Sequence, residues 1–345
     1  MEMKTDELKT KEIVFCAFKN PVIYKNTESD FPTTIPIPVP QPPDVDSQTQ
    51  TQETPQTNNT QLNGNKILNS LDDQKAIMKY QNLLIESSDE EIKLIVNDLK
   101  GKYRELILDK NGNFFCKDLF KTCDRNERIE ILKELSPTLS VDCCDNYATH
   151  PLQALIEYSS SSEEYELILS SFIENNNILS ASTNNNGAYV IQKIIARIPQ
   201  RFRNKFNAIF ISFFLFISKQ KYGIVSAKKF IENTKGKTIT QNIMNIIRNN
   251  FFDLAKDKFG NYLIPFLLEK WNNYPEVEEI KNLIIKNKDF LSNAKIPTET
   301  SHVFKKIWEN DKSETINSNK LNEQLEGNNQ LMNLLKINED NVVSP

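Results

Sequence analysis

The stretch Asn186-Gly187-Ala188-Tyr189-Val190-Ile191-Gln192-Lys193-Ile194-Ile195 has a counterpart downstream, which reads Gly260-Asn261-Tyr262-Leu263-Ile264-Pro265-Phe266-Leu267-Leu268-Glu269. In both, a short loop ends in glycine, and the segment after it has one polar or aromatic face and one aliphatic face if it is helical. Self-similarity at a period of about 20–50 residues is typical of solenoid proteins. The recurrence of this pattern along the chain therefore decides the fold.

The pattern occurs six times, with starting residues 36 to 40 positions apart. If the first residue of each copy is position 0, then positions +2, +3, +6 and +7 are apolar in every copy, except for Ser226 in the fourth. Successive residues of an α-helix are about 100° apart, which places these four positions on one face and positions 0, +1 and +4 on the other. We therefore expect each copy to bury the same four positions and to present the same three. The copies begin at Asn113, Thr149, Ala188, Ile224, Asn261 and Ser301.

Two further features support a repeated helical unit. Position −4 is Asp or Asn in four copies, where a short side chain can accept hydrogen bonds from the backbone N–H groups of a turn. Segments with their own apolar stripe precede or separate the copies, so each unit is predicted to be a helix, a short loop and a second helix. Neither helix can bury its stripe alone, and stacking of the units solves this. The sequence thus predicts an all-α solenoid. The connecting segments span residues 89–108, 127–139, 163–179, 202–217, 239–254 and 277–291.

The presented face carries a ring at position +1 in five of six copies. Aromatic rings stack on the faces of unpaired bases, at about 1–3 kcal/mol per base. Small or polar side chains beside a ring can reach the base edge. Positions 0 and +4 supply such side chains in several copies. Position +1 reads Phe114, His150, Tyr189, Val225, Tyr262 and His302.

On these residues the chain resembles the Pumilio (PUF) family of RNA-binding repeat proteins. The family's RNA-facing helices open with a motif of the type Asn-Tyr-Val-Ile-Gln after glycine, and the segments starting at Thr149, Ala188 and Asn261 are similar to it. The resemblance covers roughly residues 90 to 310 and implies a right-handed, armadillo-like superhelix that binds one base per repeat. It implies stacking by Phe114, His150, Tyr189, Tyr262 and His302. It implies base-edge contacts from Asn113, Thr149, Gln153, Ala188, Gln192, Asn261 and Ser301.

The chain departs from the family pattern in ways that predict weaker base selectivity. The family's domain usually has eight repeats, whereas six are recognisable here. No copy has a complete base-selective pair at positions 0 and +4, although Thr149 with Gln153 and Ala188 with Gln192 look adenine-like or relaxed. Pro265 cannot bond a base edge, and Ile224 with Val225 offers neither a polar edge nor a ring. Lysines at or beside +4 suit phosphate better than base edges, and the phosphate-binding candidates are Lys117, Lys193, Lys228 and Lys305.

Charge favours one half of the solenoid. The whole chain of 345 residues has a formal net charge of −4, which by itself does not indicate a nucleic-acid partner. Between residues 191 and 260, however, there are fourteen Lys and Arg residues against three Asp and Glu residues. Such a local excess can hold a phosphate chain, which predicts that the middle and later repeats bind RNA most tightly. The alternative is that these residues only solvate the outer helices.

The two ends of the chain differ from the repeats. Residues 1–64 are predicted to be a disordered low-complexity arm, since they are Pro-rich and then Gln/Thr/Asn-rich. Within this arm, the apolar residues 13–18 are either a docking motif or a chance run. Residues 65–310 form the predicted repeat domain. Residues 311–345 are predicted to be a polar, disordered tail with one short helix around 321–335.

Several classes of function are not supported by the sequence. The only two histidines, His150 and His302, both lie at position +1, and no catalytic constellation or Gly-rich phosphate loop accompanies them, so we do not expect an enzyme. Five cysteines without a Cys-x-x-Cys spacing predict neither a disulfide framework nor a zinc site. The most apolar run, 206–217, is too short to span a bilayer, and the N-terminus lacks the apolar core of a signal peptide. We expect a cytoplasmic monomer without cofactor or metal.

The resemblance implies binding to messenger RNA, in 3′ untranslated regions, with control of translation or decay through protein partners recruited by the N-terminal arm. Two alternatives remain open. Divergent proteins of this type act in the nucleolus on ribosomal RNA precursors, which the relaxed +4 positions allow. An α-solenoid can also bind proteins without RNA affinity, which Pro265, Ile224, Val225 and the acidic first half favour.

Overall fold

The computed structural model describes residues 63–173, 175 and 177–340, and every secondary-structure element within these residues is helical. All of these helices belong to one compact unit that begins at Asn59. The all-α prediction is confirmed for this part of the chain. The predicted N-terminal arm lies outside the described residues except for its last two, and so does the apolar stretch at 13–18.

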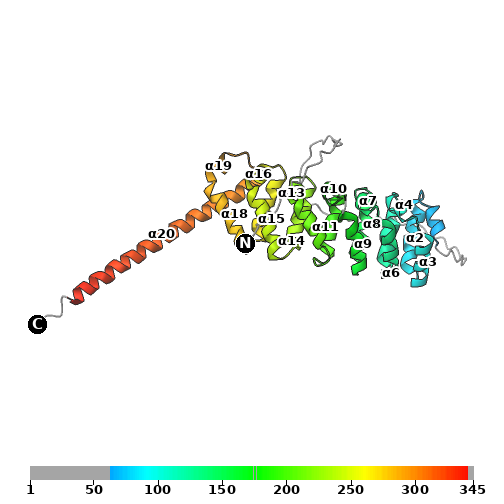
Figure 1. Ribbon diagram of the computed structural model, residues 1–345, viewed down its shortest axis with the longest axis horizontal. Coiled ribbons are helices and arrows are strands. Elements are labelled where there is room, and N and C mark those ends of the chain that lie inside the picture. Colours follow the sequence, from blue (N-terminus) through cyan, green and yellow to red (C-terminus); the bar gives the residue numbers. More distant parts are fainter. Residues whose placement is uncertain (1–62, 174, 176, 341–345) are drawn as a thin grey trace, which may run out of the picture. The chain divides into compact units, whose positions relative to one another are not determined.

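Each repeat consists of a long helix, a short helix and the helix that carries the motif, and the repeats follow one another in chain order (Figure 1). The long helices are α3 (Asp89–Asp98), α6 (Arg125–Leu135), α9 (Ser162–Ile173), α12 (Asn204–Ser212), α15 (Lys237–Asn249) and α18 (Pro275–Lys286). The short helices are α4 (Tyr103–Leu108), α7 (Leu139–Asp142), α10 (Asn177–Thr183), α13 (Phe214–Ser218), α16 (Phe251–Lys256) and α19 (Lys288–Asn293). The motif helices are α5 (Gly112–Thr122), α8 (Thr149–Tyr158), α11 (Gly187–Arg197), α14 (Gly223–Asn233), α17 (Leu263–Lys270, preceded by the 3-10 turn η1, Gly260–Tyr262) and α20 (Thr298–Asp340).

The two-helix unit predicted from sequence is wrong, because every connecting segment breaks into a long and a short helix. Gly101 has φ +80° between α3 and α4, and Asn175 has φ 52° between α9 and α10. Both values lie in the left-handed region, which a helix cannot continue through. Pro137 follows α6, where its ring and missing N–H disfavour another helical turn. Apolar periodicity runs through each break and therefore did not reveal it.

The motif helices pack side by side in one row, each against the next, from α5 to α20. Their apolar face is buried as predicted. Positions +2, +3, +6 and +7 are buried in all six copies, apart from Leu268, Val303 and Ile307, which are half-buried. Ser226, the one polar residue in this set, is also buried, and its hydroxyl has no hydrogen-bond partner within the described residues. Stacking therefore buries a continuous core, as the solenoid prediction requires.

A tight turn precedes four of the six motif helices and fixes where each of these begins. Asn184 Oδ1 accepts hydrogen bonds from the backbone N–H groups of Asn186 at 2.8 Å and Gly187 at 3.0 Å. A Cβ on Gly187 would lie 2.6 Å from the carbonyl oxygen of Ala181, so no larger residue fits without a backbone shift. The predicted role of position −4 is thus confirmed in the third copy. The same turn is made by Asp109, Asp145 and Asp257.

Both ends of the repeat array contain helix beyond the six copies. α2 (Gln74–Glu86) follows the short α1 (Gly64–Leu68) and packs against α5, so it adds a seventh helix to the row of motif helices. No motif marks it, although Asp73 caps its first turn by accepting from the N–H groups of Lys75 and Ala76. At the other end, α20 contributes Phe304 and Trp308 to the core and continues to Asp340. The predicted tail is therefore helical over residues 311–340, and only 341–345 lie outside the described part.

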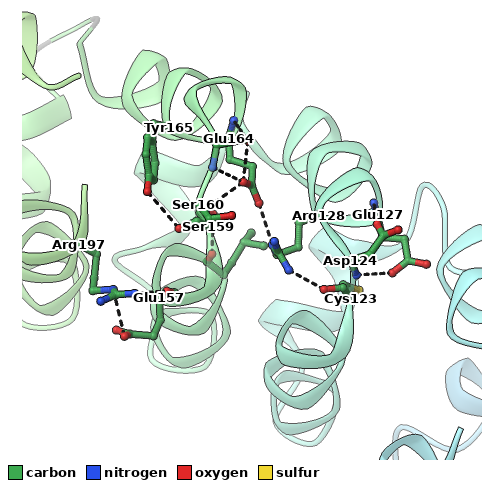
Figure 2. A network of polar contacts seen from close by, with 12 residues as sticks. Cys123, Asp124, Glu127, Arg128, Glu157, Ser159, Ser160, Glu164, Tyr165 and Arg197 are labelled. Atoms are coloured by element: carbon green, nitrogen blue, oxygen red, sulfur yellow. Dashed lines mark hydrogen bonds and ion pairs between the residues drawn. The ribbon is translucent and has the colours of Figure 1, made fainter. Parts of the chain in front are cut away.

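A buried ion pair fastens the second repeat to the third (Figure 2). Arg128, at the start of α6, donates from Nε to Glu164 Oε1 at 2.8 Å and from Nη1 to the carbonyl oxygen of Cys123. Glu164, at the start of α9, is fully buried and also accepts from the backbone N–H groups of Ser160 and Ser161. This ion pair links α6 to α9 and thereby helps to fix the position of the third repeat against the second.

Two repeats further along, the corresponding arginine has no carboxylate among its hydrogen-bond partners in the described residues. Arg203 is 2% exposed and donates to the carbonyl oxygens of Ile198 and Asn233, to Asn207 Oδ1 and, at 3.4 Å, to Thr234 Oγ1. Burial lowers the pKa of this guanidinium to about 10. The fold therefore carries an uncompensated positive charge between α12 and the end of α14, held by neutral acceptors.

Candidate nucleic-acid interface

The row of motif helices presents the +1 side chains, which we call the stacking row. Phe114 is 48% exposed and Tyr189 is 39% exposed, and His150 and His302 are also exposed. Tyr262 is half-buried, and a lysine of the fourth repeat lies over its ring. Because consecutive motif helices pack against each other, these side chains follow one another along one face of the repeats. The prediction that the rings are presented to solvent is confirmed for four of five.

Position 0 is buried, and the prediction that it is presented is wrong for five of six copies. Ala188 and Thr149 are 3% exposed, Asn113 is 1% exposed and Asn261 is not exposed. Ile224 is buried too, and Ser301 alone is partly exposed. In these five copies position 0 is the first or second residue of the α-helix or, for Asn261, of the 3-10 turn η1. Contacts with the turn before the helix or with the next repeat, which a helical wheel does not show, bury it.

The buried position 0 side chains already have hydrogen-bond partners. Asn113 Nδ2 donates to the carbonyl oxygens of Asp109 and Lys110, at 2.8 and 2.9 Å. Asn261 Nδ2 makes the same two bonds in the fifth copy, and Thr149 Oγ1 donates to the carbonyl oxygen of Asn186 in the next repeat. Burial and these bonds keep the side chains away from solvent, so the base-edge role predicted for Asn113, Thr149, Ala188 and Asn261 has no support in this conformation.

The two glutamines at position +4 are half-buried and folded back along their own helices. Gln153 Nε2 donates to the carbonyl oxygen of Thr149 at 3.1 Å, and Gln192 Nε2 donates to that of Ala188 at 3.0 Å. Each amide oxygen is left as the side-chain group that can accept from a ligand. The lysines at +4 of the first and last copies, Lys117 and Lys305, are exposed.

A carboxylate from the second repeat neutralises two basic side chains of the third. Glu157 lies 2.7 Å from Lys193 Nζ and 3.1 Å from Arg197 Nε, and Arg197 Nη2 also donates to the carbonyl oxygen of Glu157. Lys193 was predicted to bind phosphate, but its ammonium is tied to this carboxylate. The sequence pattern does not reveal this pairing, because Glu157 lies 36 residues before Lys193 and 40 residues before Arg197, in a different repeat.

The fifth stacking position is covered by a lysine of the fourth repeat. Lys228 Nζ lies 5.6 Å from the ring centre of Tyr262 and 5.3 Å from that of Phe266. Burial lowers the pKa of Lys228, against the opposing effect of Glu299, Glu269 and Glu232. The pKa of Tyr262 is raised by burial and by the neighbouring Glu299 carboxylate. Phe266 at position +5 was missed from sequence, although it is the only aromatic residue at +5.

The environment of His150 favours a neutral imidazole. Burial lowers its pKa below the ordinary 6.5, and the neighbouring Lys117 ammonium lowers it further. A neutral ring stacks on a base without adding charge, whereas an imidazolium would also attract phosphate.

The described residues contain no cluster of metal ligands, no helix suited to cross a membrane and no disulfide-bonded cysteine. Among residues 63–173, 175 and 177–340, no three His, Cys, Asp or Glu side chains come together as metal ligands. In the same part of the chain, no helix is both long and apolar enough to cross a bilayer. The four cysteines described are free thiols, and Cys116 is buried at its predicted core position.

The repeats match a known family. The model described as the Pumilio-family RNA binding repeat matches residues 102–136, 177–205 and 250–282. Pumilio homolog 12 of Arabidopsis thaliana is 24% identical to the chain over 216 residues, which are 61% of this chain and 36% of that protein. These matches support a divergent Pumilio-type repeat protein. The three segments matched by the Pumilio model contain the first, third and fifth motif helices, whereas α14, with Ile224 and Val225, lies outside them.

Two solved Pumilio-type structures share the fold. The Puf4 RNA binding domain bound to HO endonuclease RNA 3′ UTR recognition sequence has a TM-score of 0.63 and 22% identity, over 67% of this chain and 72% of that one. The RNA-binding domain of yeast Puf5p bound to SMX2 RNA has a TM-score of 0.60 and 21% identity, over 70% of this chain and 68% of that one. The likeness confirms the predicted Pumilio-repeat solenoid.

Proposed function

We propose that this chain binds single-stranded RNA along the stacking row, as a non-enzymatic RNA-binding protein. The observation that carries the proposal is the succession of exposed rings at one position of consecutive motif helices. Such rings stack on bases of any sequence, and the exposed Lys117 and Lys305 add attraction for phosphate. Solved relatives of the same fold are complexes with RNA, which supports the same ligand class here.

We further propose that the target is messenger RNA, bound in 3′ untranslated regions by a cytoplasmic monomer that alters translation or decay. This rests on the similarity to Pumilio proteins and on the 3′ UTR sequence bound by the Puf4 domain. Recruitment of protein partners is assigned to the N-terminal arm. Crosslinking by ultraviolet light in cells, followed by sequencing of the recovered RNA, tests the target class. Ribosomal RNA precursors in the recovered pool would favour nucleolar action instead, and recovery of no RNA would favour a protein-binding scaffold.

A substitution at the stacking row tests the mechanism directly. Tyr189→Ala should weaken binding to a short A/U-rich strand by about 5- to 150-fold, because a stacked base contributes about 1–3 kcal/mol. The matched control is Tyr274→Ala, since Tyr274 is 37% exposed, close to the 39% of Tyr189, but precedes α18 outside the stacking row. Affinity is measured by fluorescence anisotropy at fixed salt. Equal affinities of the two variants would contradict stacking on Tyr189.

A further inference from the structure

The fourth and fifth stacking positions differ from the first three. The first three repeats present Phe114, His150 and Tyr189, all exposed. The fourth presents Val225, which has no ring, and the fifth presents Tyr262 beneath the Lys228 ammonium. The uninterrupted series of open rings is therefore limited to α5, α8 and α11.

The Lys228 side chain that covers Tyr262 contacts a second ring as well. Lys228 Nζ faces two rings, Tyr262 and Phe266, which both belong to the fifth repeat. Lys270 Nζ lies 5.9 Å from the ring centre of Phe266, and Glu299 lies near enough to raise the pKa of Tyr262. In contrast, Lys117 and Lys305 occupy the same +4 position as Lys228 and remain exposed.

A base that stacks on the covered face of Tyr262 must first displace the lysine. A partly desolvated cation–π contact is worth up to about thirty-fold in an equilibrium constant. Base stacking on one ring is worth about 5- to 150-fold. The exchange of lysine for base is thus nearly balanced, so this position contributes little to affinity in the natural chain.

We propose that Lys228 caps Tyr262 and closes the fifth stacking position, so that RNA is stacked mainly on the first three repeats. Lys228 then acts as a specificity-determining residue that limits the length of the stacked tract, and not as a phosphate ligand. This inference rests on the proposed RNA-binding function and specifies which part of the stacking row performs it.

A cycle of Lys228 and Tyr262 variants tests the cap. With an A/U-rich strand of eight nucleotides, Lys228→Ala should bind about three- to tenfold more tightly than the natural chain, since it opens a stacking face. Tyr262→Ala should change affinity less than about twofold in the natural chain, and should abolish the gain when combined with Lys228→Ala. Lys228→Arg retains a cation over the rings and should behave like the natural chain. Lys305→Ala, the exposed counterpart, should weaken binding.

The outcomes distinguish failure of the Lys228 cap from absence of RNA binding. Weaker binding by Lys228→Ala, similar to Lys305→Ala, would identify Lys228 as a phosphate contact and overturn the cap. An effect of Tyr262→Ala as large as that of Tyr189→Ala would show an open position and overturn it as well. Absence of RNA binding in the natural chain would remove the proposed function and this inference with it. The contact has a readout without RNA. The natural chain, the two single alanine variants and their combination should give a non-zero coupling energy in thermal unfolding, and strict additivity would show that Lys228 and Tyr262 do not interact.

Discussion

Replacement of Glu164 by glutamine tests whether a buried ion pair fastens neighbouring repeats. Glu164 Oε1 accepts from Arg128 Nε at 2.8 Å, and Oε2 accepts from the N–H groups of Ser160 at 2.9 Å and Ser161 at 2.7 Å. Glutamine retains the shape, but it turns one acceptor oxygen into an NH₂ donor and removes the charge opposite Arg128. Removal of one partner of a buried pair costs about 3–5 kcal/mol, and since glutamine keeps one acceptor we expect about 3 kcal/mol.

Urea unfolding followed by circular dichroism measures the loss of stability. Because repeat proteins do not always unfold as one unit, hydrogen exchange of amides in α6 and α9 should locate the effect at this junction. Glu166→Gln is the matched control, since Glu166 is an exposed carboxylate on the same helix and should change stability by less than about 0.5 kcal/mol. If Glu164→Gln is as stable as Glu166→Gln, the ion pair does not hold the repeats together.

The same variant should lose part of the acid sensitivity of the natural chain. Burial alone would raise the pKa of Glu164, but the hydrogen bonds from Ser160, Arg128 and Ser161 together lower it below the ordinary 4.5. A carboxyl whose folded pKa is lowered contributes stability that is complete above its unfolded pKa and is lost as the pH falls through its folded pKa. The natural chain should therefore lose this contribution below about pH 4.5, and Glu164→Gln should not.

Three further changes have defined expected outcomes. Glu157→Gln frees the side chain of Lys193 for phosphate, so RNA affinity at low salt should rise about two- to fivefold and the salt dependence should steepen, as anisotropy titrations at several salt concentrations would show. Thr234→Asp places a carboxylate beside the buried Arg203 guanidinium and should raise the free energy of unfolding by about 1 kcal/mol in urea, because the lowered pKa of Arg203 reflects an uncompensated charge. Burial lowers the pKa of His150 in the free chain, and a phosphate bound near the imidazole would raise that pKa. RNA binding should then take up a proton, so RNA affinity should rise about two- to fivefold as the pH is lowered from about 7.5 to about 5.5. His150→Phe keeps the ring and should remove that part of the pH dependence.

The sequence predicted those features that depend on a single helix. The spacing of the apolar positions defined the motif helices and their buried face, because helical periodicity relates residues only three and four positions apart. The breaks in the connecting helices were missed at Gly101 and Asn175, where the apolar stripe continues through a left-handed residue. The burial of Asn113 and Asn261 was missed because it depends on the turn before the helix.

Contacts between repeats lie beyond what the helical pattern can show. Lys228 and Tyr262 are 34 residues apart, and Glu157 and Lys193 are 36 apart, so neither contact appears on any single helical wheel. The chemistry of each residue type was read correctly as basic or aromatic. The partner of each side chain was not predicted, because the packing of one motif helix on the next determines which side chains meet.

These contacts also change the meaning of the basic window between residues 191 and 260. Of its fourteen Lys and Arg residues, only Lys193, Arg197, Lys228 and Lys229 lie on motif helices. Lys193 and Arg197 share Glu157, Lys229 lies 3.3 Å from Glu232, and Lys228 faces two rings.

The remaining ten belong to long helices, short helices and loops. Most of the excess positive charge therefore lies outside the motif helices, and the four basic side chains on these helices already contact carboxylates or rings. The first three repeats have fewer basic residues but have the open rings Phe114, His150 and Tyr189, and one exposed lysine at +4. Stacking needs an open ring face, whereas a charge already paired with a carboxylate adds little attraction for phosphate. The placement of the side chains thus supports RNA binding mainly by the first three repeats, whereas the basic composition of residues 191–260 indicates the middle and later repeats.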